Sequence, residues 1–262
     1  MPTRILISCT IIARDEADRI ERCIMAVRGI ADEIVVIDSG STDDTVAIAE
    51  RLGARVVFRA WTGYGQQKRF AEDTAKHDWV LNLDADEFIS AELAAEISSL
   101  MASEPPLKAY HFKQVTVYPG WSKPRLWADY KNQVRLYDRR VVRFHDSLTH
   151  DTVDMKDLPA GQLTGEAMHF SWRSLDHVAR KLEGYTDLQA LEIKKARWKL
   201  LLRQPIEYPY LFFRFYLLRR HFTGGLYGVK VAHTFAAGRA KRISKFLAHQ
   251  AASKGQAATK GL

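Results

Sequence analysis

The feature that most constrains this chain is a short apolar run that ends in a cluster of acids. Residues 79–83 (WVLNL) suit one buried strand, and Asp84, Asp86 and Glu87 fill three of the next four positions. Side chains two positions apart in an extended chain project to the same side, so Asp84 and Asp86 can face one point. Two carboxylates that close repel each other unless a cation offsets their charge, as a divalent ion bound to phosphate would. A polar turn after a strand is the plainer interpretation of the same residues.

Strand and helix patterns alternate along the residues that precede these acids. The first helix pattern has apolar residues at 20, 23, 24 and 27, which is the spacing of one helical face. Ser41 and Asp44 resemble a helix cap with an acid three residues on. The alternation predicts an α/β fold with a mostly parallel sheet flanked by helices, and a helical basic C-terminal extension. Strands are predicted at 5–12, 33–37, 54–58 and 79–83, each of the first three followed by a helix.

Acids follow two of these predicted strands. Asp38 comes directly after the second strand, and Asp84 and Asp86 come after the fourth. In parallel sheets, ligands bind beyond the carboxyl ends of the strands. We therefore expect the three acids to converge on one crevice.

Three segments in this order resemble the inverting family 2 glycosyltransferases, which have the nucleotide-sugar-binding, Rossmann-like GT-A fold. They are residues 8–16 (SCTIIARDE), 36–45 (VIDSGSTDDT) and 83–87 (LDADE). Residues 133–137 (QVRLY), 148–151 (LTHD) and 169–174 (HFSWRS) further resemble the lipopolysaccharide-core β-1,4-glucosyltransferases that act on inner-core heptose. The resemblance implies a metal-dependent hexosyltransferase that moves a hexose, with UDP-glucose as the expected donor. The implied acceptor is lipopolysaccharide core or another lipid-linked glycan.

The same resemblance implies roles for single residues. Asp86 would be the main ligand of Mn²⁺ or Mg²⁺, with Asp84 supporting the metal or the nucleotide, because a cation stabilises the leaving diphosphate. Asp38 would bind the nucleoside, although a turn or capping role explains it as well. Lys68 and Arg69 match a basic position that could reach the diphosphate, and an ordinary solvated helix face is the alternative. Arg14 completes the expected nucleotide-sugar site.

Inversion requires a base that takes the proton of the acceptor hydroxyl. The related glucosyltransferases carry Val-His-Glu where this chain has residues 149–151 (THD), so Asp151 is the first candidate, one methylene shorter than Glu. Asp129 is the second candidate and Glu87 the third. His150 and His169 are possible metal ligands by residue type, but a hydrogen-bonded structural role is favoured for each.

The expected acceptor side is an aromatic and basic loop. Aromatic faces stack on sugar rings, and cations suit phosphorylated or carboxylated glycans. Simple packing beneath a loop is the equal alternative. The aromatic members are Trp121, Trp127 and Tyr130, and the basic members are Lys123, Arg125 and Lys131.

The charge of the chain is divided unevenly between two expected domains, a catalytic domain at 1–176 and a helical basic region at 177–262. The first holds 22 basic and 27 acidic residues, net −5, and the second holds 17 and 4, net +13. No Asp or Glu occurs after Glu207. Such asymmetry indicates an anionic partner, and an anionic membrane surface is expected rather than nucleic acid, for which no binding motif is present. A core helix is the alternative for the apolar part of this region.

The cysteine content suits a reducing compartment. Cys9 and Cys23 give no disulfide framework, and no signal peptide pattern precedes the first strand. The expected location is therefore cytoplasmic, peripheral on the inner face of the cytoplasmic membrane. The competing function is a nucleotide-sugar-binding relative without transfer activity, such as a sensor or a nucleotidyltransferase. The latter is disfavoured because no glycine-rich phosphate loop follows the first strand.

Overall fold

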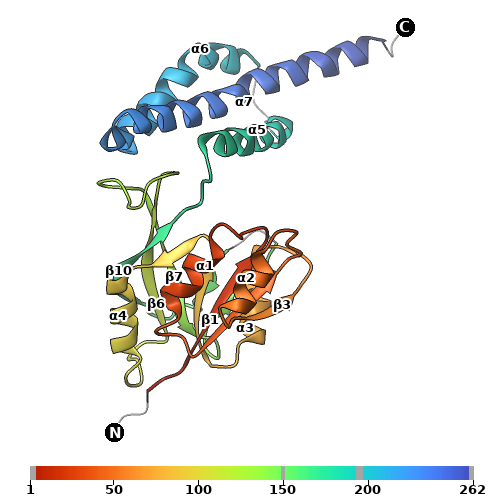
Figure 1. Cartoon of the computed structure of the whole chain (residues 1–262). Helices are drawn as coiled ribbons and strands as arrows, with labels where there is room; N and C mark the ends of the chain where they lie inside the picture. The colour runs from red at the N-terminus through yellow and green to blue at the C-terminus, as the bar shows by residue number, and fades with distance from the viewer. Residues whose placement is uncertain (1–3, 149–150, 193–196, 260–262) are drawn as a thin grey trace. The chain divides into compact units, whose positions relative to one another are not determined.

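The computed structural model describes residues 4–148, 151–192 and 197–259, and the chain forms two compact units. The first unit is Met1–Thr116 with Tyr130–Ser171, and the second is Val117–Asp129 with Trp172–Leu262 (Figure 1). The segment between β6 and β7 therefore belongs with the C-terminal helices. The expected boundary at residue 176 did not separate residues 117–129 from the catalytic domain.

A mixed sheet of eight strands forms the centre of the first unit, in the order β3-β2-β1-β4-β7-β6-β10-β5. Strands β3, β2, β1 and β4 are mutually parallel, whereas β7 runs antiparallel to both β4 and β6. The strand bounds are β1 Ile7–Ala13, β2 Glu33–Asp38, β3 Arg55–Phe58, β4 Trp79–Asp84, β5 Glu87–Ile89, β6 Ala109–Thr116, β7 Tyr130–Asp138 and β10 Gly161–His169. Two short strands, β8 Arg143–Phe144 and β9 Val153–Asp154, pair separately.

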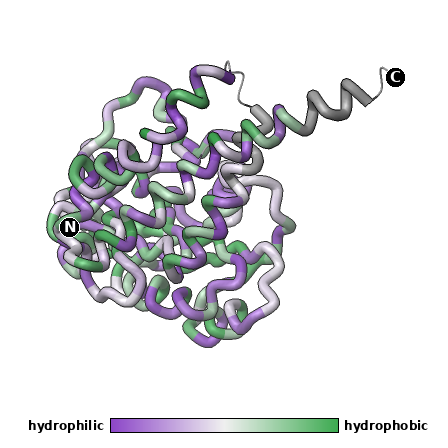
Figure 2. Tube along the Cα trace, turned by 90° about the horizontal axis from the view of Figure 1, so that it is seen from above, coloured by the Kyte–Doolittle hydropathy of each residue, from purple (hydrophilic) through white to green (hydrophobic). Residues whose placement is uncertain are grey.

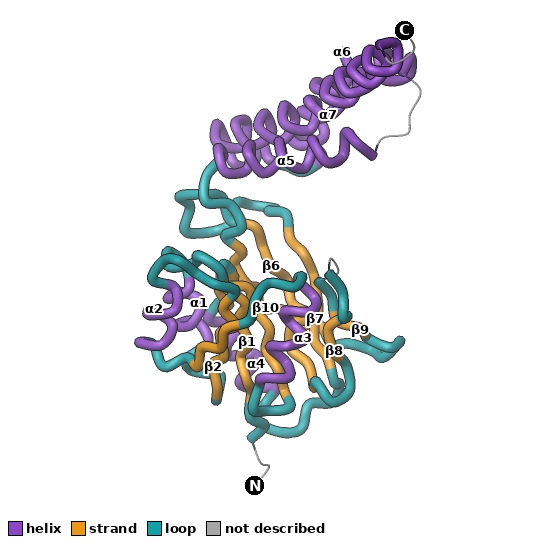
Figure 3. Tube along the Cα trace, turned by 90° about the vertical axis from the view of Figure 1, so that its right-hand side faces the viewer, coloured by secondary structure: helices purple, strands orange, loops and turns teal. Residues whose placement is uncertain are grey.

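Helices cover both faces of this sheet (Figure 3). On one face, α1 (Ile20–Val27), α2 (Thr45–Arg51) and α4 (Ala91–Leu100) pack in one large apolar core with the strands. On the other face, α3 (Tyr64–Thr74) packs through Ala71 against Ile12, Val35 and Ile37. All seven residues of β1 are buried, as a strand covered on both faces requires. The predicted fold class is confirmed.

The start of α2 differs from the sequence prediction. The helix begins at Thr45, and Ser41 is not its cap. The Ser41 hydroxyl donates instead to Asp38 and accepts from the Asp15 backbone N–H at 2.9 Å, so it links the loops after β1 and β2. The cap prediction was wrong because tertiary partners occupy the side chain that would have capped the helix.

Three long helices form the second unit: α5 (Leu175–Glu192), α6 (Arg197–Phe213) and α7 (Gly225–Thr259). A π-helical turn, η1 (Arg214–Leu218), and a 3-10 turn, η2 (His221–Gly224), connect α6 to α7. Hydrophobic and hydrophilic residues alternate along the described part of α7, which packs beside both α5 and α6 (Figure 2). Within the described residues, no helix combines the length and apolar character needed to cross a membrane.

Polar contacts hold the segment between β6 and β7, Val117–Asp129, to the helices of the second unit. The Tyr118 hydroxyl lies 2.5 Å from Nδ1 of His221. The buried Arg125 guanidinium donates to the backbone carbonyls of Arg219 at 2.8 Å and Arg220 at 3.0 Å. These carbonyls lie where the π-helical turn ends, so Arg125 supplies donors that the helix itself lacks there.

Candidate active site

The register of the parallel strands places two of the predicted acids at one edge of the sheet. Asp38 is paired with Ala13, and Asp84 with Ile12, so the two acids end the strands on either side of β1. Strands are about 4.8 Å apart, so the two backbones are separated by about 10 Å along this edge. The sequence expectation that Asp38 and Asp84 share one edge agrees with this register.

Asp84 is surrounded by cations that the fold buries. Lys68 on α3 places Nζ 2.8 Å from Oδ1 of Asp84, and Arg135 on β7 places Nη2 3.3 Å from Oδ2. Burial alone would raise the pKa of Asp84, but the charges of Lys68 and Arg135 outweigh it and hold that pKa well below its usual range. Burial and the Asp84 charge raise the pKa of Glu87, which shares Arg135 at 3.3 Å. The environment therefore favours the ionised form more strongly for Asp84 than for Glu87.

Lys68 also contacts the first candidate for the base. Its ammonium lies 2.7 Å from Oδ1 of Asp151, and its side chain is fully buried, whereas those of Asp84 and Asp151 are about a quarter exposed at 25% and 26%. Lys68 therefore joins the end of β4 to the segment that carries Asp151. The two acids, and not the lysine, face solvent.

A glycine allows this segment to approach α3. Gly63 precedes α3 with φ +127°, and a Cβ at this position would lie 2.6 Å from the Leu148 Cα. The backbone N–H of Tyr64 donates to the Leu148 carbonyl at 3.2 Å, so the start of the helix holds the chain three residues before Asp151. Only glycine fits this close approach.

Asp86 has a different set of partners. Oδ2 of Asp86 lies 3.5 Å from Nε2 of His169 on β10 and 3.6 Å from Nη1 of Arg19. Burial opposes a charge on His169, but the hydrogen bond and the charge of Asp86 outweigh it and raise the pKa of His169. The Asp86 carbonyl accepts from the Phe170 N–H at 2.9 Å, which fixes the end of β10 beside the acids.

A carboxylate and an imidazole facing each other are ligand types that suit Mn²⁺, and a carboxylate suits Mg²⁺. The part of the chain that the structure describes contains no cluster of three or more His, Cys, Asp or Glu side chains placed to hold a metal. Magnesium is commonly bound by one or two carboxylates plus the phosphates of a substrate. Asp86 and His169 could hold a divalent cation, which would take its remaining ligands from a bound diphosphate.

Asp38 organises the turn that follows β2. Its carboxylate accepts from the backbone N–H of Gly40 at 2.9 Å and of Ser41 at 3.0 Å, and from the Ser41 hydroxyl. The side chain is buried. The turn role that the sequence left open is therefore real, and the nucleoside role of Asp38 stays a prediction.

The two remaining basic candidates of the first unit have partners other than Asp84. Arg69 is next to Lys68 on α3 but donates to the Phe144 carbonyl at 2.8 Å, since adjacent helical residues point about 100° apart. Arg14 follows β1 with an exposed side chain, its Nε 3.9 Å from Asp15. The structure brings Lys68 and not Arg69 to the acids.

The other predicted residues are divided between the units. Asp129 in the second unit receives a hydrogen bond of 3.0 Å from Arg125. Trp121 packs edge-on against Tyr118, and Trp127 is exposed, both within that unit. Tyr130 is an exposed residue of the first unit. His150 lies outside the described residues.

Sequence reasoning missed two arginines that the acids use. Arg135 is the one charge in the run 133–137, an unusual feature of a buried strand that could have been noticed. Arg19 pairs with Glu16 and donates to the Phe170 carbonyl at 2.8 Å. No local pattern distinguishes Arg19 from other charges near the start of α1.

Comparison with known proteins decides the family. Residues 8–150, which contain Asp38, Asp84, Asp86, Glu87 and Asp129 but not Asp151, match the model of the family described as glycosyl transferase family 2. The chain belongs to glycosyl transferase family 2. An uncharacterized glycosyltransferase of Rickettsia conorii is 40% identical over 250 residues, or 91% of this chain and 89% of that protein. The lipopolysaccharide core biosynthesis glycosyltransferase LpsC of Rhizobium meliloti is 27% identical over 82% of this chain and 83% of that one.

Solved structures of glycosyltransferases are also similar to part of the chain. Glucosyl-3-phosphoglycerate synthase from Mycobacterium tuberculosis, in complex with Mn²⁺, uridine diphosphate and glucosyl-3-phosphoglycerate, is 26% identical. The match has a TM-score of 0.35 over 44% of this chain and 45% of that one. The eight-stranded sheet flanked by helices is the GT-A fold of this glycosyltransferase family.

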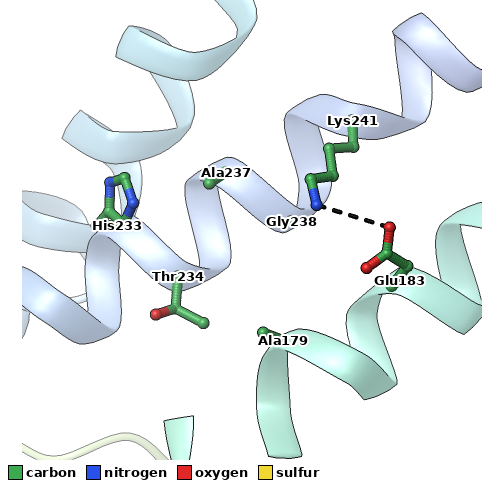
Figure 4. A pocket seen from close by; sticks show the side chains of 7 residues that line it. All are labelled: Ala179, Glu183, His233, Thr234, Ala237, Gly238 and Lys241. Atoms are coloured by element: carbon green, nitrogen blue, oxygen red, sulfur yellow. Dashed lines mark ion pairs between the residues drawn. The ribbon is translucent and has the colours of Figure 1, made fainter. Parts of the chain in front are cut away.

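The second unit has a pocket of its own between α5 and α7 (Figure 4). Lys241 lies 3.6 Å from Glu183, and Nδ1 of His233 lies 2.8 Å from the Tyr208 hydroxyl. None of the site residues predicted from the sequence lines it. The charged groups at this pocket are thus already paired.

Proposed function

We propose that this family 2 glycosyltransferase moves a hexose, with inversion, from a UDP-sugar onto a lipid-linked glycan. The observation that carries the proposal is the buried Lys68 ammonium, which lies within 2.8 Å of both Asp84 and Asp151. It sets the acid at the end of β4 beside the acid proposed as the base, with both partly open to solvent. A transfer site needs these two functions side by side, because one acts on the leaving group and the other on the acceptor.

In the proposed reaction, the acceptor hydroxyl oxygen bonds to the anomeric carbon while the bond from that carbon to the diphosphate oxygen breaks. The hydroxyl proton passes to the Asp151 carboxylate, whose Oδ1 pairs with Lys68, and the electrons of the broken bond stay with UDP. Lys68 holds Asp151 in place and keeps its carboxylate turned to the edge of the sheet. Asp129 is the second candidate for the base, and Glu87 is the third because its side chain is buried and pairs with Arg135.

The divalent cation belongs beside Asp86, with His169 facing the same carboxylate oxygen and Asp84 two residues away. When bound, Mn²⁺ or Mg²⁺ would neutralise the charge that grows on the leaving diphosphate. Asp38 with Arg14 would meet the nucleoside end of the donor, since Asp38 ends the strand on the far side of β1. Arg69 would assist only from a different side-chain rotamer.

Glucose as the transferred sugar and a lipopolysaccharide-type acceptor are the finer parts of the proposal. The resemblance of residues 133–137 and 169–174 and the relative named LpsC support them. Tyr130 of the first unit, and Trp121 and Trp127 of the second unit, each remain predicted contacts of the acceptor glycan. We place the enzyme on the inner face of the cytoplasmic membrane, since Cys9 and Cys23 are both free and buried, as suits a reducing compartment.

Release of free UDP from a panel of UDP-, GDP- and CMP-sugars, with and without Mn²⁺ or Mg²⁺, tests the donor directly. We expect turnover of a UDP-hexose that requires the cation. Binding of a UDP-sugar without any turnover, in the presence of lipid-linked glycan acceptors, would favour the sensor alternative and contradict the proposal.

A further inference from the structure

The helix α6 turns an apolar face to solvent. Its buried residues are Leu200, Glu207 and Leu211, so the inward face includes a charged side chain. The residues on the opposite side are large, apolar and between 48% and 68% exposed. We name this set the outer face of α6: Trp198, Leu201, Leu202, Ile206 and Phe213.

The spacing of these residues shows that they share one side of the helix. Trp198 precedes the buried Glu207 by nine positions, or about 2.5 turns, and so lies opposite to it. Leu202 and Phe213 fall within about 60° of Trp198 by the same count. Pro205 and Pro209, which offer no charge, lie on this side as well. The charged side chains Arg203 and Glu207 pair with each other on the inner side.

Further large apolar side chains are exposed in the turns that follow the helix. Leu217, Leu218 and Phe222 in the turns after α6 and Leu226 at the start of α7 are 42%, 66%, 40% and 84% exposed. An exposed apolar surface of this extent usually marks an interaction site. Its polar borders are basic: Arg197 and Lys199 flank Trp198, and the ammonium of Lys199 lies 5.4 Å from the Trp198 ring centroid.

The positive charge of the C-terminal residues indicates which kind of partner binds this surface. No acidic residue follows Glu207, and ten basic residues do. A second copy of the chain would bring the same positive charge against the first, whereas an anionic lipid surface complements it. Interfacial helices have this combination of apolar side chains on one side and Lys or Arg beside them, and tryptophan is enriched at the lipid headgroup level.

We propose that the outer face of α6 inserts between the headgroups of an anionic membrane, lying in the plane of its surface. This inference rests on the proposed function, because a lipid-linked acceptor stays in the bilayer and an enzyme that acts on it must bind the membrane. The binding itself needs neither donor nor acceptor. It can therefore fail or succeed independently of transfer.

The full-length protein is tested by sedimentation with vesicles of phosphatidylcholine alone or mixed with phosphatidylglycerol. We expect binding to the mixed vesicles, weakened by high salt, and at least tenfold weaker partitioning for Leu202→Gln/Phe213→Gln, which leaves the charge unchanged. Met25→Gln, which alters an apolar residue of α1 that is 50% exposed, is the matched control and keeps wild-type binding.

Tryptophan fluorescence then locates the contact. Lipids brominated near the headgroup quench a tryptophan that enters the membrane, so Trp198→Phe should retain binding and lose most of the lipid-dependent quenching. Trp61→Phe, which alters a tryptophan of the first unit that is 44% exposed, should leave the quenching unchanged.

Three outcomes would overturn the inference. Leu202→Gln/Phe213→Gln could bind mixed vesicles as the wild type does, which would leave only electrostatic attachment. It could instead lower the unfolding midpoint by several degrees, which would show that the face is packed inside the protein. A concentration-dependent dimer that the variant abolishes, without vesicle binding by the wild type, would assign the face to a second copy.

Discussion

Lys68 on α3 lies 2.7 Å from Asp151, an acid 83 positions further along the chain. The lysine side chain is fully buried by this contact and by Asp84, although it belongs to a residue type that is almost never buried unless paired. The pairing explains why α3 carries a buried cation at the position that contacts the end of β4.

Replacing the cation tests this arrangement. Lys68→Met leaves Asp84 and Asp151 to repel each other, so the free energy of unfolding should fall by about 3 kcal/mol and transfer should be lost. Adding Asp151→Asn to Lys68→Met should restore part of the stability, because one of the two repelling charges is gone. Urea denaturation of the single and double variants measures both effects. Strictly additive losses would show that Lys68 does not join the two acids.

The base is tested by an isosteric change. Asp151→Asn keeps the shape of the side chain but cannot take the proton, so transfer should fall about a hundredfold or more while UDP-sugar binding survives. Initial rates at saturating donor, with binding measured by calorimetry, separate the two. The same change at Asp129, which is paired with Arg125, serves as the comparison. If Asp129→Asn loses transfer and Asp151→Asn keeps it, the base is Asp129.

The close approach of Gly63 to the Leu148 backbone predicts a loss of activity that backbone strain at a positive φ would not cause by itself. In Gly63→Ala the new methyl group meets the Leu148 backbone, so the segment that carries Asp151 must move and transfer should fall at least about tenfold. Gly53→Ala is the matched control, because Gly53 also has positive φ, +85°, but has open space around it. It should lose stability by about 1 kcal/mol and keep its activity. Equal activity of the two variants would remove the positioning role of Gly63.

Glu33, at the start of β2, predicts that the stability of the protein depends on pH. The Glu33 carboxylate accepts hydrogen bonds from the Ser8 hydroxyl at 2.7 Å, the Lys76 backbone N–H at 2.6 Å and the Arg55 guanidinium at 2.7 Å. Burial would raise the pKa of Glu33, but these hydrogen bonds lower it below its ordinary value of 4.5. A lowered pKa means that the ionised form stabilises the fold above pH 4.5 and that this contribution is lost as the pH falls through the folded-state pKa.

Glu33→Gln should therefore cost about 1–2 kcal/mol of unfolding free energy at pH 7, a difference that shrinks as the pH falls through the folded-state pKa of Glu33. Chemical denaturation across this range measures the difference. Glu50→Gln, on the exposed side of α2, should show little change at any pH. A cost for Glu33→Gln that is the same at pH 7 and pH 3 would contradict the assignment of the lowered pKa.

The elements with a local signal were predictable from the sequence. The residues at 20, 23, 24 and 27 form the buried face of α1, because apolar periodicity is a property of the segment itself. The edge shared by Asp38 and Asp84 followed from strand direction alone. Both depend on short-range geometry that the sequence carries directly.

Long-range partners could not be predicted in the same way. Whether Lys68 or Arg69 reaches the acids depends on which side of α3 meets the sheet. Ser41 does not cap α2, because its hydroxyl bonds with Asp38 and with the Asp15 backbone N–H. Residues 117–129 join the C-terminal helices through Tyr118 and Arg125, a contact with residues about a hundred positions away. No local pattern announces such a contact.

We propose that Asp86 and its neighbours bind a UDP-sugar through a divalent cation. The most direct measurement is calorimetric titration of UDP-sugar into the wild type and Asp86→Ala, each with and without Mn²⁺. We expect Mn²⁺ to tighten binding to the wild type at least about tenfold and to leave binding to Asp86→Ala unchanged, with both proteins folded by circular dichroism. An equal gain in affinity from Mn²⁺ in both proteins would contradict the claim.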